Sequence, residues 1–209
     1  MNRDAAVGWV QHNLGRRTDL VTECQNALIA AQVALEGEDF LPWFLRTEVA
    51  TATTTAGEER VAAPDDFIRE WEEDALYILD SDSEWVRLTK NELGALRDAY
   101  KGVAADFPVD YALDGFYFRL FPTPDDIYTL KMIFYAHDTA LSTNIENKWL
   151  KYAPWMVIGR AVTIMAPGLR DKVAQAEGPR IEAEAKNRLV RSSEALDHTS
   201  RRYQMGGPL

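Results

Sequence analysis

The chain has 209 residues, which is enough for one domain or for two closely packed lobes with a buried core. Hydrophobic residues make up 46% and charged residues 27%, as in ordinary soluble globular proteins, so we expect no wholesale disorder. The formal net charge of −10 makes the chain a poor general binder of nucleic acid, because duplex DNA is itself densely negative.

Cys24 is the only cysteine, which excludes a disulfide within the chain and suits a reducing cytosol. Its apolar neighbours favour a small buried core residue over a nucleophile. Residues 1–4 lead directly into an amphipathic segment, so we expect no signal peptide. We also expect no membrane span, because no run of about 18 apolar residues exists.

Two helices are predicted at the start of the chain. In residues 4–14, apolar side chains recur at helical spacing, and Gly15 is suited to end this helix. Thr18 is expected to cap a second helix that ends at Gly37. The apolar stripe of this second helix consists of Leu20, Cys24, Ala27, Leu28, Ala31 and Leu35. The opening of the chain is therefore interpreted as a helical hairpin.

The composition then changes to that of β-strands. Residues 44–55 are rich in valine and threonine, and a turn leads to a short strand at 60–62, which together predict a β-hairpin. Residues 75–89 predict a second hairpin, since turn-forming residues interrupt two apolar runs. A short helix is expected at 91–100.

Two further strand signals follow. Residues 111–121 predict a strand pair with a turn at its centre, and residues 127–135 form the longest strand candidate. Residues 44–136 therefore predict a small antiparallel sheet or sandwich.

Helical character returns near residue 147. Residues 149–165 are apolar on all sides and predict a buried helix that ends near Pro167-Gly168. Residues 170–195 are charged and rich in alanine and predict another helix, which Gly178-Pro179 should kink or split. Residues 198–209 look extended or disordered in the free chain.

This order of elements predicts an α+β fold with an antiparallel β domain inserted into a discontinuous helical bundle. The expected boundaries are residues 1–40 with 144–197 for the helical domain, 41–143 for the β insertion and 198–209 for a flexible C-terminal tail. The tail contains arginine and histidine but no acidic residue, so its charge differs in sign from that of the body.

Signals for catalysis are weak. The pairs Asp65-Asp66 and Asp125-Asp126 could perform carboxylate chemistry only if they were held a few ångströms apart. Each pair follows a proline, which favours an ordinary turn.

Metal and cofactor motifs are also missing. Asp80, Asp82 and Glu84 alternate as in a calcium loop, but the required glycine and distal glutamate are absent. The sequence shows no phosphate-binding loop, dinucleotide fingerprint, nucleophile elbow or zinc-ligand spacing. We therefore expect no catalytic residue, no bound metal and no cofactor.

Aromatic residues and prolines near element boundaries are candidates for structural or interface roles. Core packing is the simpler interpretation, and a protein interface, where tryptophan, tyrosine and arginine are enriched, is the alternative. The candidates are Trp43, Trp71, Trp85, Tyr111, Pro122, Pro124, Trp149 and Trp155.

Several segments occur in an informative order along nearly the whole chain. They are Trp9–Leu20, Leu41–Phe44, Glu59–Asp74, Tyr111–Asp125, Tyr128–Leu130, Tyr135, Leu141–Asn144 and Asn147–Leu150. In this order and spacing they resemble the tailed-phage head-to-tail adaptors, also called phage adaptor, tail tubular or gatekeeper proteins. A proline within residues 169–195 departs from what this resemblance leads us to expect.

The resemblance implies a structural virion protein without catalytic activity. It implies a homo-oligomeric ring, usually a dodecamer, that binds the portal protein and receives a tail nozzle or tube protein at the head-tail neck. It also implies assembly in the bacterial host cytoplasm, no membrane contact, and packaged DNA passing through the lumen during genome ejection without sequence-specific binding. A negative lumen would let DNA pass with little adhesion.

Four residues are candidates for a portal-binding tail that becomes ordered on binding. They are Arg201, Arg202, Tyr203 and Met205. Two alternatives stay open. One is another head-tail connector, such as a stopper or tail-completion protein, and the other is a carboxylate-based hydrolase.

Overall fold

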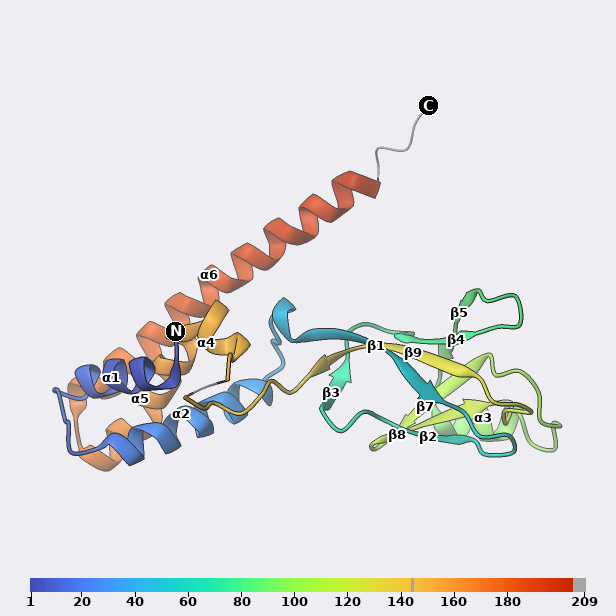
Figure 1. Ribbon diagram of the computed structural model, residues 1–209, viewed down its shortest axis with the longest axis horizontal. Helices are drawn as coiled ribbons and strands as arrows, with labels where there is room; N and C mark the ends of the chain where they lie inside the picture. The colour runs from blue at the N-terminus through green and yellow to red at the C-terminus, as the bar shows by residue number, and fades with distance from the viewer. Residues whose placement is uncertain (144, 205–209) are drawn as a thin grey trace. The chain divides into compact units, whose positions relative to one another are not determined.

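The structure, a computed structural model, describes residues 1–143 and 145–204 of the chain (Figure 1). Within these residues, helices and two small sheets form a mixed fold, which confirms the predicted α+β class. The chain divides into two compact units, a helical unit of Met1–Leu45 with Asp138–Leu209 and a β unit of Arg46–His137. The β unit is thus inserted in the sequence between the two parts of the helical unit.

The helices of the described residues are α1 (Arg3–Asn13), α2 (Val21–Glu36), the 3-10 helix η1 (Trp43–Leu45), α3 (Leu93–Ala99), α4 (Lys148–Tyr152), α5 (Pro154–Leu169) and α6 (Lys172–Gln204). The strands are β1 (Arg46–Thr53), β2 (Arg60–Ala62), β3 (Phe67–Glu70), β4 (Leu76–Leu79), β5 (Trp85–Arg87), β6 (Thr89–Lys90), β7 (Asp110–Asp114), β8 (Tyr117–Phe121) and β9 (Thr129–Ala136). The short helix α3 is the one helix among these that belongs to the β unit.

The first two helices follow the predicted periodicity. The side chain of Asn2 caps α1 by accepting a backbone N–H hydrogen bond at 2.9 Å. Gly37 lies at the end of α2, as predicted. The helix begins only at Val21, however, so the predicted cap at Thr18 is wrong. The reason is a connection that first passes through left-handed backbone at positions 15 and 16.

The buried helix predicted for residues 149–165 is in fact two helices, α4 and α5. Pro154 has no N–H to donate and its ring would clash with a preceding helical turn, so it occupies the start of α5. Helix α5 ends at Leu169, next to the predicted stop at Pro167-Gly168. Arg170 then ends it in the left-handed conformation.

Gly178-Pro179 was predicted to kink or split helix α6, and the split is wrong because α6 continues through the pair as one helix. The glycine of this pair lies where α6 meets α5. A Cβ on Gly178 would lie 2.8 Å from the backbone nitrogen of Thr163, and one on Gly159 would lie 2.6 Å from that of Glu182. The two glycines therefore allow α5 and α6 to pack with their backbones in contact.

The same helix changes the description of the C-terminus. Because α6 ends at Gln204, residues 198–204 are helical, and the predicted extended tail is wrong over this stretch. Of the candidate portal-binding residues, Arg201, Arg202 and Tyr203 lie near the end of α6, and Met205 lies outside the described residues.

The β unit contains two sheets. One has the strand order β1-β9-β4-β5, with β3 also paired to β9, and the other has the order β2-β8-β7-β6. The predicted hairpins at residues 75–89 and 111–121 are confirmed as the antiparallel pairs β4–β5 and β7–β8. The β6–β7 pair is parallel, which the sequence pattern did not predict.

The hairpin predicted for residues 44–62 is wrong. Strand β1 pairs with β9, and β2 pairs with β8 of the other sheet. After β1, the chain runs beside residues 126–128, which are distant in the sequence. Thr54 donates hydrogen bonds to the backbone carbonyls of Asp126 and Tyr128, at 2.9 Å each. Gly57 N–H then donates to Pro124 at 2.8 Å, which leads the chain into the second sheet.

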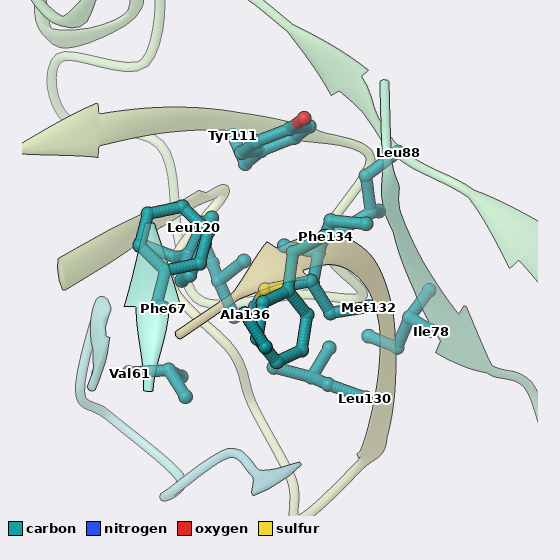
Figure 2. Close-up of a cluster of buried hydrophobic side chains, with 12 residues drawn as sticks. Val61, Phe67, Ile78, Leu88, Tyr111, Leu120, Leu130, Met132, Phe134 and Ala136 are labelled. Carbon is teal, nitrogen blue, oxygen red and sulfur yellow. The ribbon is translucent and has the colours of Figure 1, made fainter. Parts of the chain in front are cut away.

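Apolar side chains from both sheets meet in one core, which Figure 2 shows in close-up. Strand β9 alternates strictly between buried and half-buried positions, as expected for a strand with one face on a core. Its buried side chains Met132 and Phe134 lie among Phe67, Leu120 and Tyr111 of other strands. The opposite face of β9 points away from this core and carries the residues considered below.

Candidate interaction surfaces

The acidic pairs proposed for carboxylate chemistry serve as turn residues. The backbone carbonyl of Asp66 accepts a hydrogen bond from His137 N–H at 2.7 Å. The carboxylate of Asp125 accepts the hydroxyl of Tyr128 at 2.6 Å, which raises the pKa of that tyrosine to about 12. Asp126 accepts the N–H of the residue after it. The carboxylates of Asp125 and Asp126 thus have local structural roles, and Asp66 contributes its backbone carbonyl.

The candidate calcium loop is likewise a hairpin turn. One carboxylate oxygen of Asp80 accepts the N–H groups of Asp82 and Glu84 at 2.9 and 2.8 Å, which closes the turn between β4 and β5. Among the described residues, no group of three histidine, cysteine or acidic side chains is placed to hold a metal ion. Cys24 is buried, and desolvation raises the pKa of its thiol to about 11, which disfavours the nucleophilic thiolate.

Trp149 lies in the interior of the helical unit and is fully buried. Its indole N–H donates to the buried carboxylate of Glu36 at 2.9 Å. Gln32 donates to the same carboxylate, also at 2.9 Å. Asn147 caps α4 by accepting the N–H of Leu150 at 3.1 Å. The Asn-Lys-Trp-Leu segment therefore fixes the helical core.

Tyr111 and the two candidate prolines have interior positions in the β unit. Tyr111 is fully buried and donates its hydroxyl to Glu70, which also pairs with Lys90. Burial is the main cause that raises the pKa of this tyrosine. Pro122 follows a cis peptide bond, and it and Pro124 are buried where the chain passes between sheets.

The remaining candidate tryptophans are at least partly accessible. Trp43 is 41% exposed and lies against Phe44 and Tyr152. Trp71 is half-buried beneath the guanidinium of Arg46, and Trp85 is 37% exposed. A residue that contacts a partner must be accessible to solvent. These tryptophans meet that requirement, and the buried Trp149 does not.

A groove lies in the helical unit beside half-buried Trp155. It encloses about 410 Å³ between the α4–α5 junction and α6. The side chains of Ile181 and Leu189 form part of its apolar wall. Trp9 packs edge-on against Trp155, with 5.0 Å between the ring centres. Trp9 is 42% exposed and was not among the predicted interface residues. The position of Trp9 on the exposed side of α1 is the signal that could have identified it as an interface candidate.

Helix α6 is tied to the rest of the helical unit by ion pairs. Arg160 of α5 donates to both carboxylate oxygens of Glu182, at 2.8 and 2.6 Å, and also pairs with Glu38. Lys186 adds a second contact to Glu38 at 2.8 Å. Although burial alone would raise the pKa of Glu38, the hydrogen bonds from Lys186 and Arg160 hold it below its usual value.

Charge is divided unevenly between the units. The β unit contains 19 acidic and 9 basic residues, a net charge of −10. The helical unit contains 14 acidic and 14 basic residues and is neutral. The entire net charge of the chain therefore resides in the β unit.

No helix within the described part of the chain combines the length and the apolar character needed to cross a membrane. The model of the SU10 adaptor protein family, a family of phage adaptors, matches residues 3–204. This match confirms the resemblance inferred from the order of the sequence motifs. No curated protein matches the chain.

Proposed function

Since the chain belongs to the SU10 adaptor protein family, it is a structural component of a phage virion that contacts other head and tail components, and we propose that it forms an adaptor ring. The ring joins the portal vertex to the nozzle or tube of the tail. It encloses part of the channel through which DNA leaves the head.

The observation that carries this proposal is the confinement of the net charge to the β unit. Packaged DNA must pass an adaptor without adhering to it, and a surface of net charge −10 repels phosphate. The neutral helical unit has no such repulsion and is suited to protein contacts. We therefore assign the channel lining to the β unit and the portal contact to the helical unit.

A closed ring also requires two different contact surfaces on each subunit, because its contacts are head-to-tail. Two units of different secondary structure and charge supply such surfaces. In the helical unit, α6 extends to Gln204, and the ion pairs of Arg160 hold its first half in place. The end of α6, with Arg201, Arg202 and Tyr203, is the proposed portal contact.

The portal contact is tested by binding of the purified chain to purified portal rings, measured by co-sedimentation. The expected result is that deletion of residues 198–209, or the double variant R201E/R202E, lowers binding at least about tenfold. The control R97E/K101E makes the same charge change at exposed positions of the β unit and should bind normally. Unchanged binding by both altered C-termini would contradict the assignment.

A further inference from the structure

The outward face of the five-stranded sheet in the β unit has an unusual composition. Register places Lys131 of β9 beside Tyr77 of β4, and Tyr77 beside Arg87 of β5. Register also places Tyr135 of β9 between Arg46 of β1 and Arg69 of β3. Cations and aromatic rings therefore alternate across the strands on the side opposite to the core.

The cations on this face are held in fixed positions. The guanidinium of Arg46 lies 3.7 Å from the ring centre of Trp71, and that of Arg69 lies 5.6 Å from the ring centre of Tyr135. Lys131 lies between two rings, 4.7 Å from Trp85 and 5.0 Å from Tyr77. Arg87 donates to the backbone carbonyl of Asp74 at 2.8 Å. We call the surface formed by these four cations and four rings the cation–aromatic face.

The cation–aromatic face has the opposite charge to the rest of its unit. Among the outward strand positions that the structure describes, it holds four basic residues and one acidic residue, Glu48. Of the 9 basic and 19 acidic residues of the β unit, 5 basic and 18 acidic residues therefore lie elsewhere. The unit is electrically polar, with a positive face on a strongly negative body.

We infer that the cation–aromatic face binds the acidic surface of the β unit of a second copy of this chain, head to tail. This inference rests on the proposed ring and names the contact that closes it. Each copy carries both complementary surfaces, which a head-to-tail contact requires. Arginine, tryptophan and tyrosine are also the residues that contribute most to protein interfaces.

The arrangement of the side chains favours binding in a second way. Arg46 and Arg87 are exposed, and Trp85 is 37% exposed, so a partner can reach them. Because the rings and backbone carbonyls already restrict the cations, binding has a smaller entropic cost than it would for free side chains. Duplex DNA is the alternative acidic occupant, and the experiment with labelled DNA described below separates it from a second copy of the chain.

The test is sedimentation velocity of the full-length chain at about 50 mM salt over a range of concentrations. We expect R46E/R87E to weaken self-association at least about tenfold. R97E/K101E makes the same charge change on the acidic side of the β unit, so it should not weaken self-association. Raising the salt to about 500 mM should weaken association of the unaltered chain as well. Thermal unfolding of both variants checks that they are folded.

A mixing experiment tests the head-to-tail geometry. The R46E/R87E variant keeps its acidic surface, so fluorescently labelled variant should bind unaltered protein but not itself. Equal self-association by R46E/R87E and R97E/K101E would overturn the inference. So would an unaltered chain that stays monomeric at low salt, or a variant that self-associates normally but loses binding to labelled duplex DNA. None of these results bears on portal binding, so the proposed adaptor role is tested separately.

Discussion

In the helical unit 14 acidic residues accompany 14 basic ones, whereas the β unit has 19 against 9. The charged residues of the two units also make different contacts. In the helical unit, Arg160 and Lys186 join α5 and α6 to Glu38 in a partly buried network. In the β unit, a row of cations faces outward from a sheet. The β unit also has internal ion pairs, such as that of Arg119 with Asp114, but its outward row of cations has no counterpart described in the helical unit.

The largest expected effect concerns the helical core. Replacing Trp149 with alanine removes a fully buried ring and one partner of Glu36, so the free energy of unfolding should fall by about 3–5 kcal/mol. The control Trp43→Ala, at a 41% exposed position of the same unit, should cost less than about 1.5 kcal/mol. Chemical denaturation followed by circular dichroism measures both. Equal losses would contradict the assigned core.

The glycine contact between α5 and α6 gives the next largest effect. Gly178→Ala should lower stability by about 1–3 kcal/mol, because its Cβ would meet the backbone of Thr163. Gly168→Ala is the matched control, since nothing lies within 4 Å of a Cβ there. A neutral Gly178→Ala would show that the helices do not pack this closely.

A smaller effect is expected in the β unit. Tyr111→Phe keeps the buried ring but removes the hydrogen bond to Glu70, which should cost about 1–2 kcal/mol. Tyr117→Phe, at a 45% exposed position, should stay within about 0.5 kcal/mol. Thermal unfolding of the two variants compares them directly. If they behave alike, the buried hydroxyl does not stabilise the unit.

The smallest effect is a dependence on pH. The pKa of Glu38 is lowered in the folded chain, so its ion pairs stabilise the fold above the ordinary value of 4.5. This contribution is lost as the pH falls through the folded pKa. Glu38→Gln should therefore reduce the decrease in unfolding free energy on acidification, by about 1 kcal/mol or less. An identical pH profile for Glu38→Gln would show that the network contributes nothing.

Local sequence patterns predicted those parts of the fold that depend on near neighbours. The apolar spacing in residues 4–14 predicted α1, and the turn residues near Asp80 predicted the β4–β5 hairpin. The pairing of β1 with β9 was missed because its two strands are far apart in the sequence. The close contact of α6 with α5 at Gly178 was missed because it depends on a second helix rather than on near neighbours.

The candidate surfaces show the same limit. Tryptophans were recognisable as contact or core residues, but only the fold distinguishes buried Trp149 from exposed Trp85. The cation–aromatic face could not be read from the sequence, because its cations come from strands β1, β3, β5 and β9. Strand register, which aligns Arg46 with Tyr135 and Lys131 with Tyr77, creates this surface.

The most direct test of the adaptor role is the mass of the complex formed by the purified chain with portal rings. Mass photometry or native mass spectrometry gives the number of copies bound to each portal. The proposed ring predicts one complex with about twelve copies per portal, with few partly filled intermediates, because closing a ring favours complete assemblies. A chain that binds no portal, or that adds singly without a preferred number, would contradict the account.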